Sequence, residues 1–122
     1  MEVATGEIKA ISNLSSDGKG NFYERFNFAT AGLFEPGSTF KLVTMIALLE
    51  DSNVELQDSI DTGNGEAIFY NKRVRDHEEK GLGRITVQEA FEHSSNVAMA
   101  KLIDKQFGKK PEKFVDYVDR LR

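Results

Sequence analysis

The segment FEPGSTFKLVTMIALLE, residues 34–50, constrains the fold more strongly than any other part of this chain. From position 42 to position 49 every residue except Thr44 is apolar. On a helical wheel the apolar side chains of this segment spread around all sides, which is typical of a helix buried on every face. Pro36-Gly37 forms a turn before it and supplies a helix start. We therefore expect a central buried helix over residues 39–50, with the later helices packed around it.

Lys41 occupies the first turn of this apolar helix, an unusual place for a charged side chain. Ser38 stands three residues earlier, so the two side chains share a face and the amine can reach the hydroxyl. Burial lowers the pKa of a lysine, and a neutral amine can accept the proton of an attacking serine. The free N–H groups of the helix start also favour developing negative charge at Ser38. The structural alternative is an N-cap serine with a lysine that extends to water.

A second polar element, Ser94-Ser95-Asn96, separates two predicted helices. Presented from a loop into a cleft, the Ser94 hydroxyl could shuttle a proton. The Asn96 carboxamide could hold either Lys41 or an amide of a substrate. The alternative interpretation is a helix linker in which Asn96 caps the following helix.

The remaining chain predicts short strands and three further helices. A capping-box pattern opens a helix from Thr86 to His93, and a helical apolar pattern then runs from position 98 to a stop at Gly108. The other expected elements are two extended segments in residues 2–14 around Thr5-Gly6, a strand at 67–70, and a last helix after Pro111 with Phe114, Val115, Val118 and Leu121 inside.

Composition excludes several functions. The 122 residues suffice for one domain, and the net charge of −4 gives no general attraction to nucleic acid. The absence of cysteine excludes disulfides, and the longest apolar run is far shorter than a membrane helix. His77 and His93 lie too far apart, among loop carboxylates, to indicate a metal site. We expect Asp76 to have a structural role.

The order of the segments ATGEIKAI, LFEPGSTFK, IDTGNG, RVRD and TVQEAFEHSSNVAMAKL resembles the transpeptidase domain of class B penicillin-binding proteins. These are the monofunctional cross-linking enzymes of bacterial peptidoglycan, and the resemblance runs from Val3 to Phe107. It implies an α+β fold: a partial β-lactamase/transpeptidase-like domain, mainly its helical part plus an N-terminal β-hairpin.

The resemblance also implies a role for each motif residue. Ser38 would be the acylated nucleophile, Lys41 its general base, and Ser94 the relay that passes the proton to the leaving amine. Asn96 would bind the substrate's peptide amide and steady Lys41. No metal or cofactor is implied.

The partners implied are a peptidoglycan stem peptide ending in D-Ala-D-Ala and the β-lactam antibiotics, with no nucleic acid. The parent protein would lie on the periplasmic, extracytoplasmic face of the bacterial inner membrane, anchored by a segment outside this chain. There it would work with membrane proteins of cell division or elongation.

The chain departs from the family pattern at one point. The family's third motif, Lys-Ser/Thr-Gly, does not follow Ser94 anywhere in this sequence. We therefore expect residues 1–122 to be a truncated transpeptidase domain that ends before this motif and is inactive alone. The alternatives are a serine β-lactamase or penicillin-sensing domain of the same fold, and a non-catalytic binding module.

Overall fold

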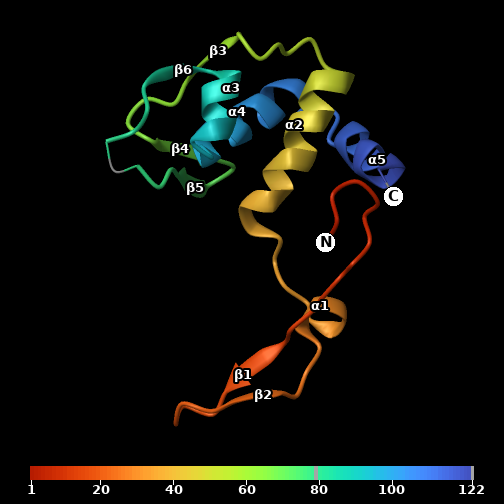
Figure 1. Ribbon diagram of the computed structural model, residues 1–122. Coiled ribbons are helices and arrows are strands. Elements are labelled where there is room, and N and C mark those ends of the chain that lie inside the picture. Colours follow the sequence, from red (N-terminus) through yellow and green to blue (C-terminus); the bar gives the residue numbers. More distant parts are fainter. Residues whose placement is uncertain (79, 122) are drawn as a thin grey trace. The chain divides into compact units, whose positions relative to one another are not determined.

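The computed structural model describes residues 1–78 and 80–121 and divides the chain into two compact units (Figure 1). The first unit runs from Met1 to Glu35 and the second from Pro36 to Arg122. All four residues of the predicted site belong to the second unit.

The first unit contains a β-hairpin and one short helix. Strand β1 (Leu14–Ser16) pairs antiparallel with β2 (Phe22–Glu24), and α1 (Phe28–Ala31) follows. The prediction of strands within residues 2–14 is wrong except at Leu14, although the expected turn forms, with the Gly6 N–H donating to the Glu2 carbonyl (2.9 Å).

The hairpin forms further along the sequence, at residues 14–24, because the loop at residues 17–21 has stronger turn-forming residues than the Thr5-Gly6 turn. The Asp17 carboxylate accepts hydrogen bonds from the N–H groups of Lys19 (2.7 Å) and Asn21 (3.2 Å). Gly18 and Gly20 adopt φ values of +73° and +92°, which glycine tolerates without steric cost.

The second unit consists of helices accompanied by two short strand pairs. Strand β3 (Ser59–Asp61) pairs with β6 (Arg84–Thr86), and β4 (Glu66–Phe69) pairs with β5 (Lys72–Arg75), each antiparallel. The β4–β5 turn places Tyr70 and Asn71 at φ +45° and +69°, as two-residue hairpin turns require. The helical elements are the 3₁₀ turn η1 (Gly37–Thr39), α2 (Phe40–Asp51), α3 (Val87–Glu92), α4 (Asn96–Phe107) and α5 (Glu112–Arg120).

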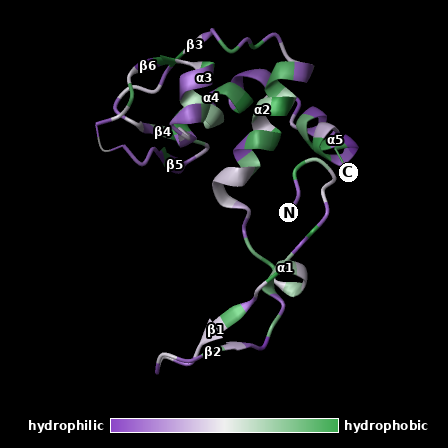
Figure 2. Cartoon of the chain, in the orientation of Figure 1, coloured by the Kyte–Doolittle hydropathy of each residue, from purple (hydrophilic) through white to green (hydrophobic). Residues whose placement is uncertain are grey.

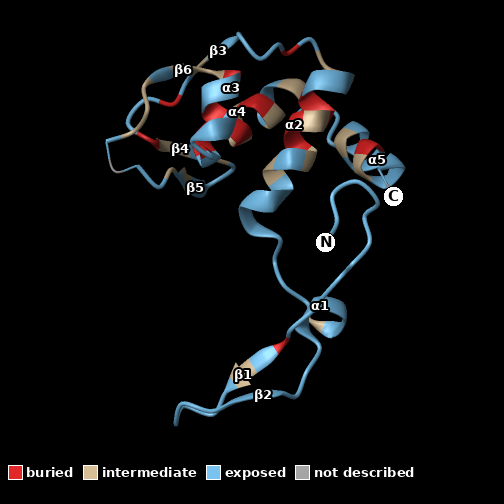
Figure 3. Ribbon diagram, in the orientation of Figure 1, coloured by how far each residue is buried: buried red, intermediate tan, exposed pale blue. Residues whose placement is uncertain are grey.

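The core of the second unit lies where α2, α3, α4 and α5 meet (Figure 3). Its buried side chains come mainly from these helices: Met45, Ala47, Leu48, Val54, Val87, Ala90, Ala98, Met99, Leu102, Phe107 and Tyr117. Within residues 1–78 and 80–121, no helix combines the length and apolarity that crossing a membrane requires.

Helix α2 is apolar along most of its length (Figure 2), but it is not buried on every side. Leu48 is fully buried, whereas the side chains of Phe40, Leu42 and Leu49 are 41%, 55% and 40% exposed. The expectation of burial on all faces is therefore wrong. Helices α4 and α5 pack against α2 but leave these three side chains open to solvent, and an apolar sequence pattern does not reveal how many neighbours a helix has.

The helix boundaries after residue 86 follow their local signals. Thr86 and Glu89 form the predicted capping box of α3, and Gly108 ends α4. Ser95, not Asn96, is the N-cap of α4, and its Oγ accepts from the Ala98 N–H (3.0 Å).

The predicted inner face of α5 is only partly correct. Phe114 and Val118 are partly buried, whereas Val115 and Leu121 are 57% and 47% exposed. Tyr117 is the buried residue of this helix, and its hydroxyl donates to the Glu50 carboxylate (2.5 Å). The phenol ring can enter the core because its polar group reaches a partner at the edge.

Candidate active site

The structure brings Lys41 and Ser94 together, although they are 53 positions apart in the sequence. The Lys41 Nζ donates to the Ser94 Oγ at 2.9 Å and also to the Ser94 carbonyl oxygen. Partial burial lowers the pKa of Lys41 below its usual value, and the negative charge of Asp76 opposes this shift. This lowering of the Lys41 pKa is the direction that the apolar sequence around Lys41 indicates.

Ser38 lies in η1, at the entrance to α2, and is exposed. Gly37 before it adopts φ +58°, a left-handed conformation that disfavours any residue with a Cβ. The N–H of Phe40 is directed at the carbonyls of Gly37 and Ser38. Among the described residues no hydrogen bond joins the Ser38 hydroxyl to Lys41 or Ser94, so only these last two are linked directly.

Ser94 has a strained backbone. Its φ of +54° lies in the left-handed region, which non-glycine residues occupy at a cost. Its N–H donates to the Phe91 carbonyl (3.0 Å) at the end of α3. This conformation turns the chain between α3 and α4 and leaves the Ser94 side chain exposed, bonded to Lys41.

Ser95, to which the sequence analysis gave no role in the site, holds this turn through a buried side chain. It is 1% exposed, and its Oγ donates to the Asp76 carboxylate, 3.0 Å from Oδ1 and 2.9 Å from Oδ2. Its N–H donates to the Ala90 carbonyl (2.9 Å). The signal available in the sequence was a serine directly before a helix, which is a preferred N-cap.

Asn96 forms its side-chain hydrogen bond with the β4–β5 hairpin. Its Nδ2 donates to the carbonyl oxygen of Arg75 at the end of β5 (2.7 Å). Among the described residues no hydrogen bond joins Asn96 to Lys41. The carboxamide therefore ties the start of α4 to the β4–β5 hairpin.

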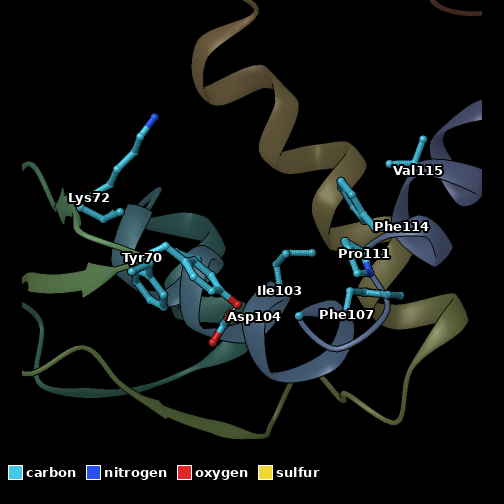
Figure 4. Close-up of a pocket in the computed structure, with 12 residues that line it drawn as sticks. Tyr70, Lys72, Ile103, Asp104, Phe107, Pro111, Phe114 and Val115 are labelled. Carbon is cyan, nitrogen blue, oxygen red and sulfur yellow. Dashed lines mark hydrogen bonds between the residues drawn. The ribbon is translucent and has the colours of Figure 1, made fainter.

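Among the described residues, the cavities near these elements include a polar and an apolar one, and the four predicted site residues are not part of the walls of either. A polar cavity of about 300 Å³ includes Gly65, Glu66, Asp76 and His77 in its walls. An apolar cavity of about 620 Å³ lies between the β4–β5 hairpin and helices α4 and α5 (Figure 4). At its edge the Tyr70 hydroxyl bonds to Asp104 (3.1 Å), which raises the pKa of Tyr70.

The Lys41–Ser94 contact fits acyl-transfer chemistry better than the larger cavity does, because that chemistry requires a base beside a hydroxyl. A sequence model of the penicillin binding protein transpeptidase domain matches residues 1–122, the whole chain. This chain belongs to the penicillin-binding protein transpeptidase family. The resemblance to a class B transpeptidase domain is confirmed.

The relatives and the structural neighbour agree with this family. The chain is 32% identical over 109 residues to "Penicillin-binding protein 1A" of Aquifex aeolicus, and this alignment covers 86% of the chain. It is 28% identical to the "Peptidoglycan D,D-transpeptidase FtsI homolog" of Mesostigma viride over 99% of its length. It is 33% identical to "Stage V sporulation protein D" of Bacillus subtilis over 75% of its length.

Among solved structures, the apo transpeptidase domain of penicillin-binding protein 3 from Burkholderia pseudomallei matches with a TM-score of 0.61 and 29% identity. The match covers 74% of this chain and 26% of the other, and it confirms the partial α+β transpeptidase-like fold. The chain spans only 14–22% of the length of the three relatives.

Proposed function

We propose that the parent protein is a serine D,D-transpeptidase that cross-links peptidoglycan stem peptides and is acylated by penicillin. The observation that carries this proposal is the hydrogen bond from Lys41 Nζ to Ser94 Oγ, one helical turn from Ser38, in a member of this family. The lowered pKa of Lys41 supports a role as base, because only the neutral amine accepts a proton.

In the acylation step, the Ser38 Oγ attacks the carbonyl carbon between the two terminal D-alanines of the stem peptide. The neutral Lys41 amine takes the hydroxyl proton as the new C–O bond forms. The C–N bond then breaks, and the leaving D-alanine receives a proton from the Lys41 ammonium through the Ser94 hydroxyl. Penicillin would acylate Ser38 in the same way, with its ring nitrogen as the group that accepts the proton.

In the second step, an amine of a neighbouring strand attacks the acyl carbon and forms a new C–N bond. The ester C–O bond to Ser38 breaks, and the proton lost by the amine returns through Lys41 to the Ser38 oxygen. Asn96 would bind the peptide amide of the stem. Its present hydrogen bond to the Arg75 carbonyl uses Nδ2, so we propose that its Oδ1 accepts from the substrate. The reaction would take place at the extracytoplasmic face of the inner membrane, with partners in division or elongation.

We further propose that residues 1–122 alone are inactive, because the third motif of the family does not occur in them. In the family this motif supplies a cation, a hydroxyl for the substrate carboxylate and an oxyanion-hole donor. Loss of a single such donor can slow a reaction by about 10²–10³-fold. The remaining Ser38 and Lys41 would therefore react with penicillin orders of magnitude more slowly than a complete domain.

Intact-mass spectrometry with labelled penicillin tests both parts of this proposal. We expect no appreciable adduct on the 122-residue chain after one hour. In a chain extended through the third motif, the adduct should form on the Ser38 peptide and be lost in Ser38→Ala. Rapid stoichiometric labelling of the 122 residues would refute the requirement for the third motif. An unlabelled extended chain would instead indicate a non-catalytic module.

A further inference from the structure

Asp76 is the residue on which the 94–97 turn depends. Its carboxylate accepts hydrogen bonds from two residues of this turn: one shared between its two oxygens from the buried Ser95 hydroxyl, and one from the Val97 N–H (2.9 Å). Asp76 follows β5 directly, and its own N–H donates to the Gly65 carbonyl (2.9 Å). Asp76 is thus held by both its backbone and its side chain.

The neighbouring residues reinforce the same junction. Asn96 donates to the carbonyl of Arg75, the last residue of β5. Arg75 and Asp76 together therefore hold three residues of the turn: Ser95, Asn96 and Val97. Ser94 lies immediately before these anchored positions, with its strained φ of +54°. A residue in the left-handed region persists only when its surroundings fix it. The contacts to Asp76 supply that constraint.

Asp76 also acts on Lys41 through its charge. Among the described residues, it is the charged group that favours the ammonium form of Lys41, against the effect of burial. The adjacent Arg75 directs its guanidinium to Glu66 instead (2.9 Å).

We propose that Asp76 is a positioning residue for the Lys41–Ser94 pair: its carboxylate holds the 94–97 turn so that the Ser94 hydroxyl faces the Lys41 amine, and its negative charge favours the ammonium form of Lys41. This inference rests on the proposed function for its catalytic meaning, but its two physical effects belong to the 122-residue chain itself. The carboxylate fixes the hydroxyl that relays the proton. Its charge partly offsets the effect of burial on how readily Lys41 gives up its proton.

The two effects separate in a pair of substitutions. Asp76→Asn removes the charge but keeps an oxygen that can accept from Ser95 and the Val97 N–H. Ser95→Ala removes a donor but keeps the charge. Asp104→Asn, at the Tyr70 contact, provides a control with the same change in net charge. The Lys41 Nζ resonance of ¹⁵N-lysine-labelled protein reports its titration directly, without any activity measurement.

We expect the Lys41 titration midpoint to move to lower pH in Asp76→Asn and to remain unchanged in Ser95→Ala and Asp104→Asn. A purely structural Asp76 would alter the melting temperature without moving this midpoint. An unchanged midpoint in folded Asp76→Asn would overturn the proposal. If Asp76→Asn does not fold, an acid titration of the wild-type protein replaces it. The Lys41 Nζ signal should then shift over the same pH range as the Asp76 carboxyl signal. Shifts over different pH ranges would overturn the proposal.

A separate measurement tests whether the Asp76 carboxylate holds the 94–97 turn. Amide exchange at Val97 should accelerate at least tenfold in Asp76→Ala, which removes the acceptor, relative to wild type. Unchanged exchange at Val97 in folded Asp76→Ala would refute the positioning role. Failure of penicillin to acylate the extended chain would refute only the proposed function, because neither the Lys41 titration nor the Val97 exchange depends on acylation.

Discussion

Leu48→Ala should destabilise the second unit strongly, because this leucine is fully buried in α2. The substitution removes three carbon atoms from the centre of the core formed by α2, α3, α4 and α5. Burial of a leucine accounts for roughly 1.5–3 kcal/mol, and the cavity left behind raises the measured loss to about 2–5 kcal/mol. A loss near 3 kcal/mol lowers the melting temperature by roughly 10–25 °C for a unit of this size.

Leu42→Ala, in the same helix, is the matched control. Its side chain is 55% exposed, so less than half of the transfer free energy is at stake, about 1 kcal/mol or less. Guanidinium unfolding followed by circular dichroism at 222 nm measures both variants, with the m-value as a check on two-state behaviour. Equal losses for the two leucines, or a loss below about 1 kcal/mol for Leu48→Ala, would refute the unequal burial of these two side chains of α2.

The remaining predictions concern a helix cap and a pH dependence. Thr86→Ala should cost about 1 kcal/mol, measured by the same unfolding, because it removes the Oγ1 that accepts from the Glu89 N–H (3.1 Å); a neutral result would contradict the capping box. The folded-state pKa of Lys41 is lowered, so between that pKa and the unfolded value of about 10.4 the unfolded chain binds more protons and the free energy of unfolding rises with pH. Relative to Lys41→Met, which lacks this titration, wild type should therefore gain stability toward pH 10, and parallel pH profiles would contradict the lowered pKa.

The elements that the sequence predicted well are those with complete local signals. The Thr86 capping box, the apolar spacing from position 98 and the stop at Gly108 each specify a helix boundary within a few residues. Strand β4 likewise follows from its alternating pattern. Local chemistry decides these elements, so no knowledge of the tertiary structure is needed.

The errors arise where tertiary contacts or competing turns decide. The exposure of Leu42 depends on which sides of α2 have neighbours. Tyr117 can be buried because Glu50, on another helix, accepts a hydrogen bond from its hydroxyl. The hairpin in the first unit formed at residues 14–24 because the Asp17 loop closes it.

The sequence indicates which residues to propose for the candidate site, but it does not indicate most of the contacts that these residues make. The spacing of Ser38 and Lys41, together with Ser94, gave the resemblance, and the structure joins Lys41 to Ser94. The role of Asp76 toward Ser95 could not be inferred, because a loop aspartate and a buried serine 19 positions apart carry no spacing signal. Asn96 is oriented by the backbone carbonyl of residue 75. Every residue type has this carbonyl, so the sequence carries no signal for the contact.

The 94–97 turn combines features that a simple helix linker would not need. Glycine would adopt the φ of +54° at position 94 without steric cost, whereas a serine there costs about 1–2 kcal/mol. Lys41 adds the cost of partial burial, which its lowered pKa reports. The Ser95 hydroxyl and the Asp76 carboxylate satisfy one another and so fix the strained conformation. What the strain achieves is a hydroxyl 2.9 Å from the Lys41 amine, and glycine could not provide it.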